Sequence, residues 1–327
     1  MQWIEDVFAW AQQGLFESAI QPIMFSFGLG HLLEDGFVAT GWLLVGLIQI
    51  AVLLAIIGPL QRWRPVESMV DAASIRTDVL YTLLHRLGLF RVALFFSVEP
   101  LFDELFGYLR VNGFGTAHLD QVWAGVTDHA WISFVIYLVV FDFVDYWLHR
   151  GQHTLNWWWS LHSLHHSQRQ MTMWSDNRNH LLDDLLRDCA LVVVGQLIGV
   201  GPGQFVAIVA ITQLSESLQH ANIRLHFGRI GERLWISPRF HRLHHSIGIG
   251  HERNAQGELV PRGRSPALGG HNFGVLLPWW DMLFGTANFE LRWDPTGIRD
   301  QVQGNRDYGK GFWSQQWLGV LRLVGRA

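Results

Sequence analysis

The sequence has little charge and almost no cysteine. Only 16% of its 327 residues are Asp, Glu, Lys or Arg, against roughly a quarter in ordinary soluble domains. This deficit, beside 49% hydrophobic residues, favours a membrane protein. The single cysteine, Cys189, excludes an intrachain disulfide and a cysteine-based metal site, so metal ligands would be His or carboxylate. Acids and bases are interspersed at a net charge of −4, without a basic stripe, so nucleic acid is not an expected partner.

Long apolar segments predict membrane helices. Residues 37–60 hold one Gln and no charge over 24 positions, enough for about 36 Å of helix. Arg62 and Arg64 follow at once and predict that this end faces the cytosol. Residues 78–98 would return across the bilayer, and residues 131–150 would cross back, ending on the cytosolic side.

The last apolar region, residues 185–218, is interrupted by GVGPG at 199–203. Each half is short for a hydrocarbon core of about 30 Å, and Gly and Pro favour a turn. Histidine motifs lie both before and after this region, so a single site requires the chain to return to the side it left. We therefore expect a re-entrant hairpin or a closely spaced helix pair.

These patterns divide the chain into three parts. Residues 1–36 mix apolar residues at helical spacing with acids, which predicts a helix lying in the membrane interface or, alternatively, one packed on a partner chain. Residues 37–220 form the transmembrane helical region, and residues 221–327 form a cytosolic cap. The expected fold class is all-α: a polytopic membrane helical bundle of about four membrane-embedded helical units, with a cytosolic His-rich helical cap.

Histidines gather in three short motifs. At the chain's own His frequency, H-x-x-H-H would arise by chance roughly 0.04 times in a chain of this length, so two copies are about a one-in-a-thousand accident. On a helix, side chains three and four positions apart share one face. The motifs are H-x-x-x-H at His149 and His153, H-x-x-H-H at His162, His165 and His166, and H-x-x-H-H again at His241, His244 and His245.

Eight clustered imidazoles indicate a metal centre. Packed together without metal, each would need hydrogen-bond partners or carry a burial penalty. Imidazole suits zinc, copper, iron and nickel, but a structural zinc site needs only about four ligands. The number therefore favours two metals. A di-iron pair with open positions can activate dioxygen, whereas di-zinc hydrolysis would be expected to show bridging carboxylates and a general base, neither of which is obvious.

Further residues are candidates for the site. Asp142 and Asp145 lie inside an apolar span, where ionisable residues are costly and usually functional. Asp145, four before His149, could accept its second ring proton, or could pair with an Arg. His220 is the stronger additional ligand and His180 a tentative one, because both flank the predicted hairpin. Trp157, Trp158 and Trp159 are explained by the membrane interface, where Trp is enriched.

The order and spacing of these motifs, with HNFGVLLPWWDMLFGT at 271–286, resemble the fatty acid hydroxylase / sterol desaturase superfamily of integral-membrane non-haem di-iron oxygenases. The resemblance covers about 130–290. It implies two iron ions held by the eight motif histidines together with His220. It also implies hydroxylation or desaturation of a lipid, such as a sterol, fatty acyl, carotenoid or ether lipid, with dioxygen and external electrons.

The resemblance carries expectations about partners and location. Electrons would come from a separate donor of cytochrome b5, ferredoxin or reductase type, since no haem domain is fused at either end. The protein would lie in a bacterial inner membrane or the endoplasmic reticulum, with its site on the cytosolic face. The first box is narrower than in fatty acyl 2-hydroxylases, which speaks against that subgroup. The Gly/Pro/Arg-rich stretch 248–270 is a lid, a docking loop or a disordered loop.

Two other classes remain open. A membrane haem protein for electron transfer would also place His on helices, but it does not require H-x-x-H-H repeats. A non-catalytic metal-binding or sensor protein would hold metal without consuming oxygen.

Overall fold

The computed structural model describes residues 2–247 and 270–327, which form helices joined by short loops. Within these ranges there is no β-strand, only an isolated antiparallel bridge between Ser246 and Thr296. The all-α prediction is therefore confirmed. The interpretations of the 248–270 stretch concern residues that, Gly270 apart, lie outside the described ranges.

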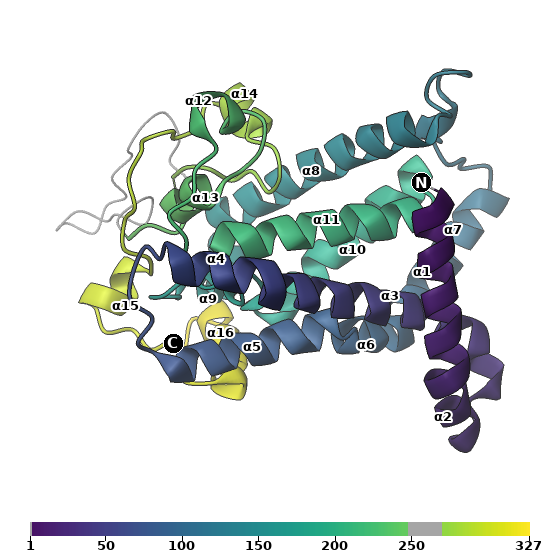
Figure 1. Cartoon of the computed structure of the whole chain (residues 1–327), viewed down its shortest axis with the longest axis horizontal. Helices are drawn as coiled ribbons and strands as arrows, with labels where there is room; N and C mark the ends of the chain where they lie inside the picture. The colour runs from purple at the N-terminus through teal and green to yellow at the C-terminus, as the bar shows by residue number, and fades with distance from the viewer. Residues whose placement is uncertain (1, 248–269) are drawn as a thin grey trace.

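Long helices run side by side along the molecule (Figure 1). They are α3 (Leu33–Val52), which continues through η3 (Leu53–Ile57) into α4 (Gly58–Trp63), α8 (Ala130–Thr154), α10 (Leu181–Ile198) and α11 (Pro202–His220). Two stretches, Gly30–Trp63 and Ala130–Thr154, are long and apolar enough to cross a membrane. They contain the predicted spans 37–60 and 131–150. That these two helices cross a membrane, and how many other segments do, stays a prediction.

Shorter helices cover the ends of this bundle. At one end α1 and α2 stand across the long helices, and the helices around α13 gather at the other end (Figure 1). The remaining elements are α1 (Gln2–Leu15), η1 (Phe16–Ile20), α2 (Gln21–Ser26), η2 (Gly30–Leu32), α5 (Ala72–Arg86), α6 (Leu89–Ser97), α7 (Glu99–Val111), η4 (Leu119–Gln121), α9 (Asn156–His166), η5 (Ser175–Asn177), α12 (Gly228–Gly231), α13 (Pro238–His244), α14 (Trp279–Phe284), α15 (Arg299–Gln303) and α16 (Phe312–Leu323).

Glycines break two of the predicted apolar segments. Gly88, at φ 78°, separates α5 from α6, so 78–98 is two helices rather than one. Gly199, at φ 71°, ends α10, and Pro202 begins α11 two residues later. Positive φ is adopted most readily by Gly, which has no Cβ. The predicted return of the chain is thus made by two consecutive helices, α10 and α11, which both pack on α8 and carry the chain from one group of histidines back to the other.

Capping and packing fix the cap onto the bundle. The Ser237 side chain accepts the Phe240 N–H at the start of α13, which places the third histidine motif on a short, well-defined helix. Leu276 and Leu277 pack into a buried cluster with Tyr137 and Phe141 of α8. The segment 271–286, which contains these two leucines, is therefore held against α8, the helix that carries the first histidine motif.

Candidate metal centre

Nine histidines converge at the cap end of the bundle. They come from the last turns of α8 and α11, from α9, and from α13 with the residue after it. Their ligand atoms form two groups of four within 4.8 Å of one another: His149, His153, His162 and His166, and His165, His220, His241 and His245. A third group, His166, His244 and His245, joins the two.

The second group has the spacing of ligands around one ion. The Nε2 atom of His220 lies 3.1 Å from the Nε2 atoms of both His165 and His241, and His241 Nε2 lies 3.1 Å from His245 Nε2. Nitrogen ligands bind at about 2.0–2.1 Å from a metal such as zinc, which puts neighbouring nitrogens about 3 Å apart. The four imidazoles thus fit a metal without rearrangement.

Buried nitrogens of the first group and of His244 also lack partners. The Nε2 atoms of His162, His166 and His244 are buried and meet no hydrogen-bond partner among the described residues. Leaving such atoms unsatisfied costs about 1–3 kcal/mol each. Coordination of a metal removes this cost, so the donor set fits a second ion beside the first.

Protein oxygens orient four of the rings. The Nδ1 atoms of His149, His220 and His244 each lie 2.8 Å from a backbone carbonyl, those of Phe273, Glu216 and His271. His162 Nδ1 lies 2.9 Å from the Asp183 carboxylate. If each Nδ1 carries the proton, Nε2 is left as the metal-binding atom, the arrangement found behind most histidine ligands.

Burial keeps these imidazoles neutral, which is the form that binds metal. It lowers the pKa of His244 to about 4. Burial, followed by neighbouring imidazoles, also holds the pKa values of His162, His165, His166, His241 and His245 well below their usual range.

Two predicted site residues have other partners. Asp145 does not contact His149: its Oδ1 atom accepts a 2.8 Å hydrogen bond from Arg187, because His149 Nδ1 already faces the Phe273 carbonyl. His180 stands outside the cluster. Its Nε2 faces the Gln316 carbonyl at 2.8 Å and its Nδ1 caps α10, so it docks α16 instead of facing the metal centre.

Asp183 takes the place that was predicted for Asp145. One carboxylate oxygen faces His162, while the other accepts 2.7 Å hydrogen bonds from Gln152 and Trp158. Trp158 therefore helps to hold this carboxylate, a contact that the interface explanation missed. The available signal was an acid three residues after His180, but only the approach of α10 to α9 selects Asp183 over Asp184.

The closing segment at 271–286 is fastened by two buried carboxylates. Asp142 accepts the N–H groups of Leu276 and Leu277, and Asp281 accepts those of Phe273 and Gly274. The segment supplies the carbonyls that face His149 and His244. Asp142 thus acts on the site through the backbone of this segment.

A cavity of about 740 Å³ opens from the centre into the bundle. His149, His162, His165, His220 and His241 line one part of it, and residues of α2, α3, α5, α6, α7, α8, α10 and α11 line the rest. An elongated molecule in this cavity could therefore reach the histidines while most of it lies among the helices.

Comparison with known proteins identifies the region. Residues 134–286, which hold all nine histidines, match the family model described as fatty acid hydroxylase. Over these residues the chain is similar to the fatty acid hydroxylase family. The superfamily resemblance drawn from the motifs is thereby confirmed, and the matched region runs from α8 through the hairpin to α14.

Curated relatives of this chain act on lipids. The chain is 26% identical over 273 residues to the ornithine lipid hydroxylase of Rhizobium tropici, covering 80% of this chain and 71% of that protein. It is 25% identical over 171 residues to the alkylglycerol monooxygenase of Caenorhabditis elegans, covering 51% of this chain but 29% of that enzyme. No solved structure matches the chain.

Proposed function

We propose that this chain is a membrane-bound oxygenase that hydroxylates or desaturates a lipid, with two iron ions held by its nine clustered histidines. The observation that carries the proposal is the pair of adjoining four-histidine groups joined by His166, His244 and His245. They face a cavity that continues into the bundle. The match to the fatty acid hydroxylase family and the lipid-hydroxylating relatives support the same chemistry.

The residues of the site have two roles: they would bind the metal ions, and they exclude water. His149, His153, His162 and His166 would hold one ion, His165, His220, His241 and His245 the other, and His244 lies between them. The bound irons would supply dioxygen activation, which side chains alone do not provide. Asp183 and the carbonyls of Phe273, Glu216 and His271 fix the ring orientations, and burial keeps water from the site.

The overall reaction balances for either outcome. In hydroxylation, one oxygen atom enters a C–H bond as hydroxyl and the other leaves as water; in desaturation, the lipid loses two hydrogen atoms and both oxygen atoms leave as water. Each reaction consumes two external electrons and two protons. We infer that the electrons come from a separate donor of cytochrome b5, ferredoxin or reductase type. We place the site on the cytosolic face because Arg62 and Arg64 end the Gly30–Trp63 helix on the side of the cap.

The proposal is tested on purified protein and on lipid extracts. Two irons per chain and no Soret band are expected, whereas haem would reveal an electron-transfer protein. Zinc alone, with no reactivation by iron, would overturn the di-iron assignment. Lipids from cells with and without the protein, grown under ¹⁸O-labelled dioxygen, should differ by a product that the His165→Ala variant does not form. This product carries the label if a C–H bond is hydroxylated, and is unlabelled and two mass units lighter than its substrate if the lipid is desaturated. An unchanged lipid profile would favour a non-catalytic metal-binding protein.

The substrate class follows from the relatives only in outline. Ornithine lipid hydroxylase is matched over most of both chains, so membrane lipids with a polar head group are the first candidates. Ether lipids come second, because the match to alkylglycerol monooxygenase covers only about half of this chain. The same labelled-oxygen experiment identifies the lipid.

A further inference from the structure

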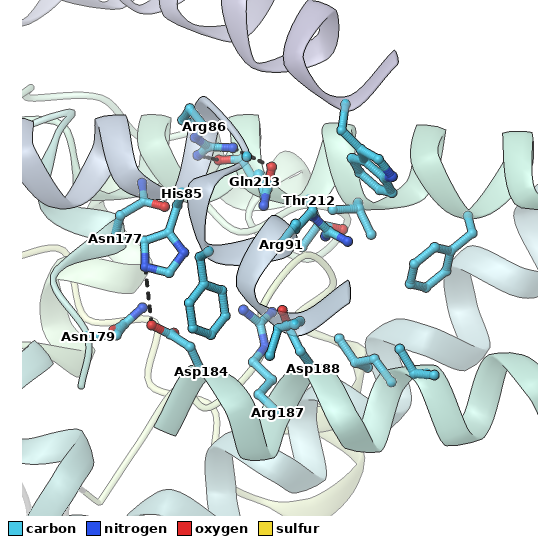
Figure 2. Close-up of a pocket in the computed structure, with 18 of the residues that line it drawn as sticks. His85, Arg86, Arg91, Asn177, Asn179, Asp184, Arg187, Asp188, Thr212 and Gln213 are labelled. Carbon is cyan, nitrogen blue, oxygen red and sulfur yellow. Dashed lines mark hydrogen bonds and ion pairs between the residues drawn. The ribbon is translucent and has the colours of Figure 1, made fainter. Parts of the chain in front are cut away.

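The lining of the cavity is polar in the region between the histidines and its apolar part. A ring of polar side chains from α5, α6, η5 and α10 surrounds it there, and Figure 2 shows them pointing into a common space. We call this ring the polar belt and define it as His85, Arg91, Asn177, Asp184, Arg187 and Asp188. Beyond it, at the end of the bundle near α2, the wall is mostly apolar: it includes Met24, Leu43, Leu94 and Phe102, with Asp35 and Asp103 beside them.

The polar belt directly adjoins the metal centre. Asp184 follows Asp183, whose carboxylate faces His162. Arg187 binds Asp145, one turn before His149, and lies 3.6 Å from Glu216, whose carbonyl faces His220. A group held in the belt would therefore lie next to the histidines, and a group in the apolar part would lie farther away.

The charges of the whole cavity favour a cation. Eight carboxylates and three guanidiniums line the cavity, and the belt itself holds two of each. Asp184 lies 3.3 Å from His85 Nε2 (Figure 2), and Asp188 stands one helical turn farther along the same face of α10. Arg91 and Arg187 both attract Asp188 electrostatically, and among the described residues Asp188 accepts no side-chain hydrogen bond. Two carboxylates are thus directed to the cavity, where an ammonium group would be desolvated beside them.

Buried polar atoms near the belt also lack partners. Asn177 is 8% exposed and Gln219 is 1% exposed, and both line the cavity. Asn177 Nδ2 and Gln219 Oε1 meet no hydrogen-bond partner among the described residues. One is a donor and the other an acceptor. A ligand with both hydrogen-bonding functions would satisfy them, since buried polar groups are normally paired.

We propose that the polar belt binds the head group of the lipid substrate and that this head group bears an ammonium group. Asp184 and Asp188 bind the ammonium, and Asn177 and Gln219 bind neighbouring ester, amide or hydroxyl groups. The acyl chains lie in the apolar part of the cavity. This inference rests on the proposed function. It has a second consequence: the C–H bond that is oxidised lies in or next to the head group, and not at the end of an acyl chain.

The same carboxylates have a competing role. Imidazole ligands are neutral, so the charge of two metal ions would be left to nearby carboxylates to balance. This alternative predicts that removing a belt carboxylate changes metal content or redox potential and leaves lipid preference unchanged. The two roles are therefore separated by measuring metal and lipid on the same sample.

The binding experiment uses the full-length, iron-loaded protein in detergent and native mass spectrometry. Delipidated protein is offered phosphatidylethanolamine, which bears an ammonium, and phosphatidylglycerol, which does not, with identical acyl chains. The wild type should prefer phosphatidylethanolamine, and Asp188→Asn and Asp184→Asn should each weaken that lipid about tenfold, the change that corresponds to 1.4 kcal/mol. Asp6→Asn, an exposed change on α1 away from the cavity, is the matched control.

The outcomes distinguish this inference from the proposed function. Equal binding of the two lipids by the wild type, or iron loss with unchanged lipid preference in both variants, would overturn the head-group assignment. If the preference for phosphatidylethanolamine depends on the two aspartates but no oxygenated product forms, the head-group site is supported and the proposed function is contradicted. Where product forms, tandem mass spectrometry should place the added oxygen within a few carbons of the head group, and oxygen at the chain terminus would contradict the orientation.

Discussion

Asp183 and Asp145 are similar carboxylates with different partners, and only one of them contacts a histidine of the cluster. Both are acids in largely apolar helices, but Asp183 faces the His162 ring while Asp145 binds Arg187. A carboxylate behind a histidine fixes its orientation and raises its basicity. The same chemical group on the neighbouring helix α8 pairs with the partly buried guanidinium of Arg187.

Asp183→Asn should weaken metal binding about 10–100-fold, because the His162 Nδ1–H loses a charged acceptor. Asp145→Asn is the matched control and should retain its iron, since Asp145 does not contact a histidine. Iron per chain after dialysis against a graded chelator measures the difference. Equal iron loss from the two variants would contradict the assigned roles.

The burial of His244 predicts an acid limit for the metal-free protein. Its pKa is lowered to about 4, so between pH 6.5 and 4 the unfolded chain binds a proton that the folded protein rejects. Stability is therefore full above pH 6.5 and falls as the pH drops, by about 1.4 kcal/mol per pH unit for this group. The thermal midpoint of metal-free protein in detergent should fall across this range. A flat profile from pH 6.5 to 4 would exclude the effect.

At the scale of the element, the closing segment 271–286 acts as a strap. Its carbonyls orient two histidines, and Asp142 and Asp281 hold its backbone. Gly274 is enclosed: an added Cβ would lie 2.8 Å from both Asp281 Oδ2 and Ile236 Cδ1, and 2.9 Å from the Leu277 carbonyl. The strap therefore has room only for the backbone at this point.

Gly274→Ala should destabilise the protein by about 1–3 kcal/mol, the usual range for overpacking a buried site, and should lower iron occupancy. Gly203→Ala is the comparison, because its Cβ would meet nothing within 4 Å. In the first turn of α11 this change should be neutral or slightly stabilising. The thermal midpoint and the iron content of both variants are measured. Equal values for the two variants would show that the backbone around Gly274 can move to accommodate a methyl group.

At the scale of the whole molecule, the histidine cluster and the α1–α2 pair lie at opposite ends of the long helices (Figure 1). If α3 and α8 cross the membrane, these two ends face opposite sides. The cavity then connects a site near one membrane surface with apolar walls inside the bilayer. This arrangement lets a lipid remain among the helices during the reaction.

The single cysteine makes this topology measurable. In a Cys189→Ser background, Phe27→Cys at the end of α2 and Arg326→Cys at the chain terminus provide one exposed thiol each. We expect a membrane-impermeant maleimide to label Phe27→Cys in intact cells and Arg326→Cys only after lysis. Labelling of both from the same side would contradict the proposed orientation of the bundle.

The sequence by itself determined the helical class, the two longest apolar helices, the hairpin and the nine histidines that converge, because these depend on composition and short-range spacing. Tertiary structure decided the rest. Which acid faces His162, why His180 docks α16, and how Trp158 joins the site all depend on the approach of helices distant in sequence. The polar belt is likewise a product of packing: α5, α6, η5 and α10 each contribute only one to three of its side chains, and no local pattern links them.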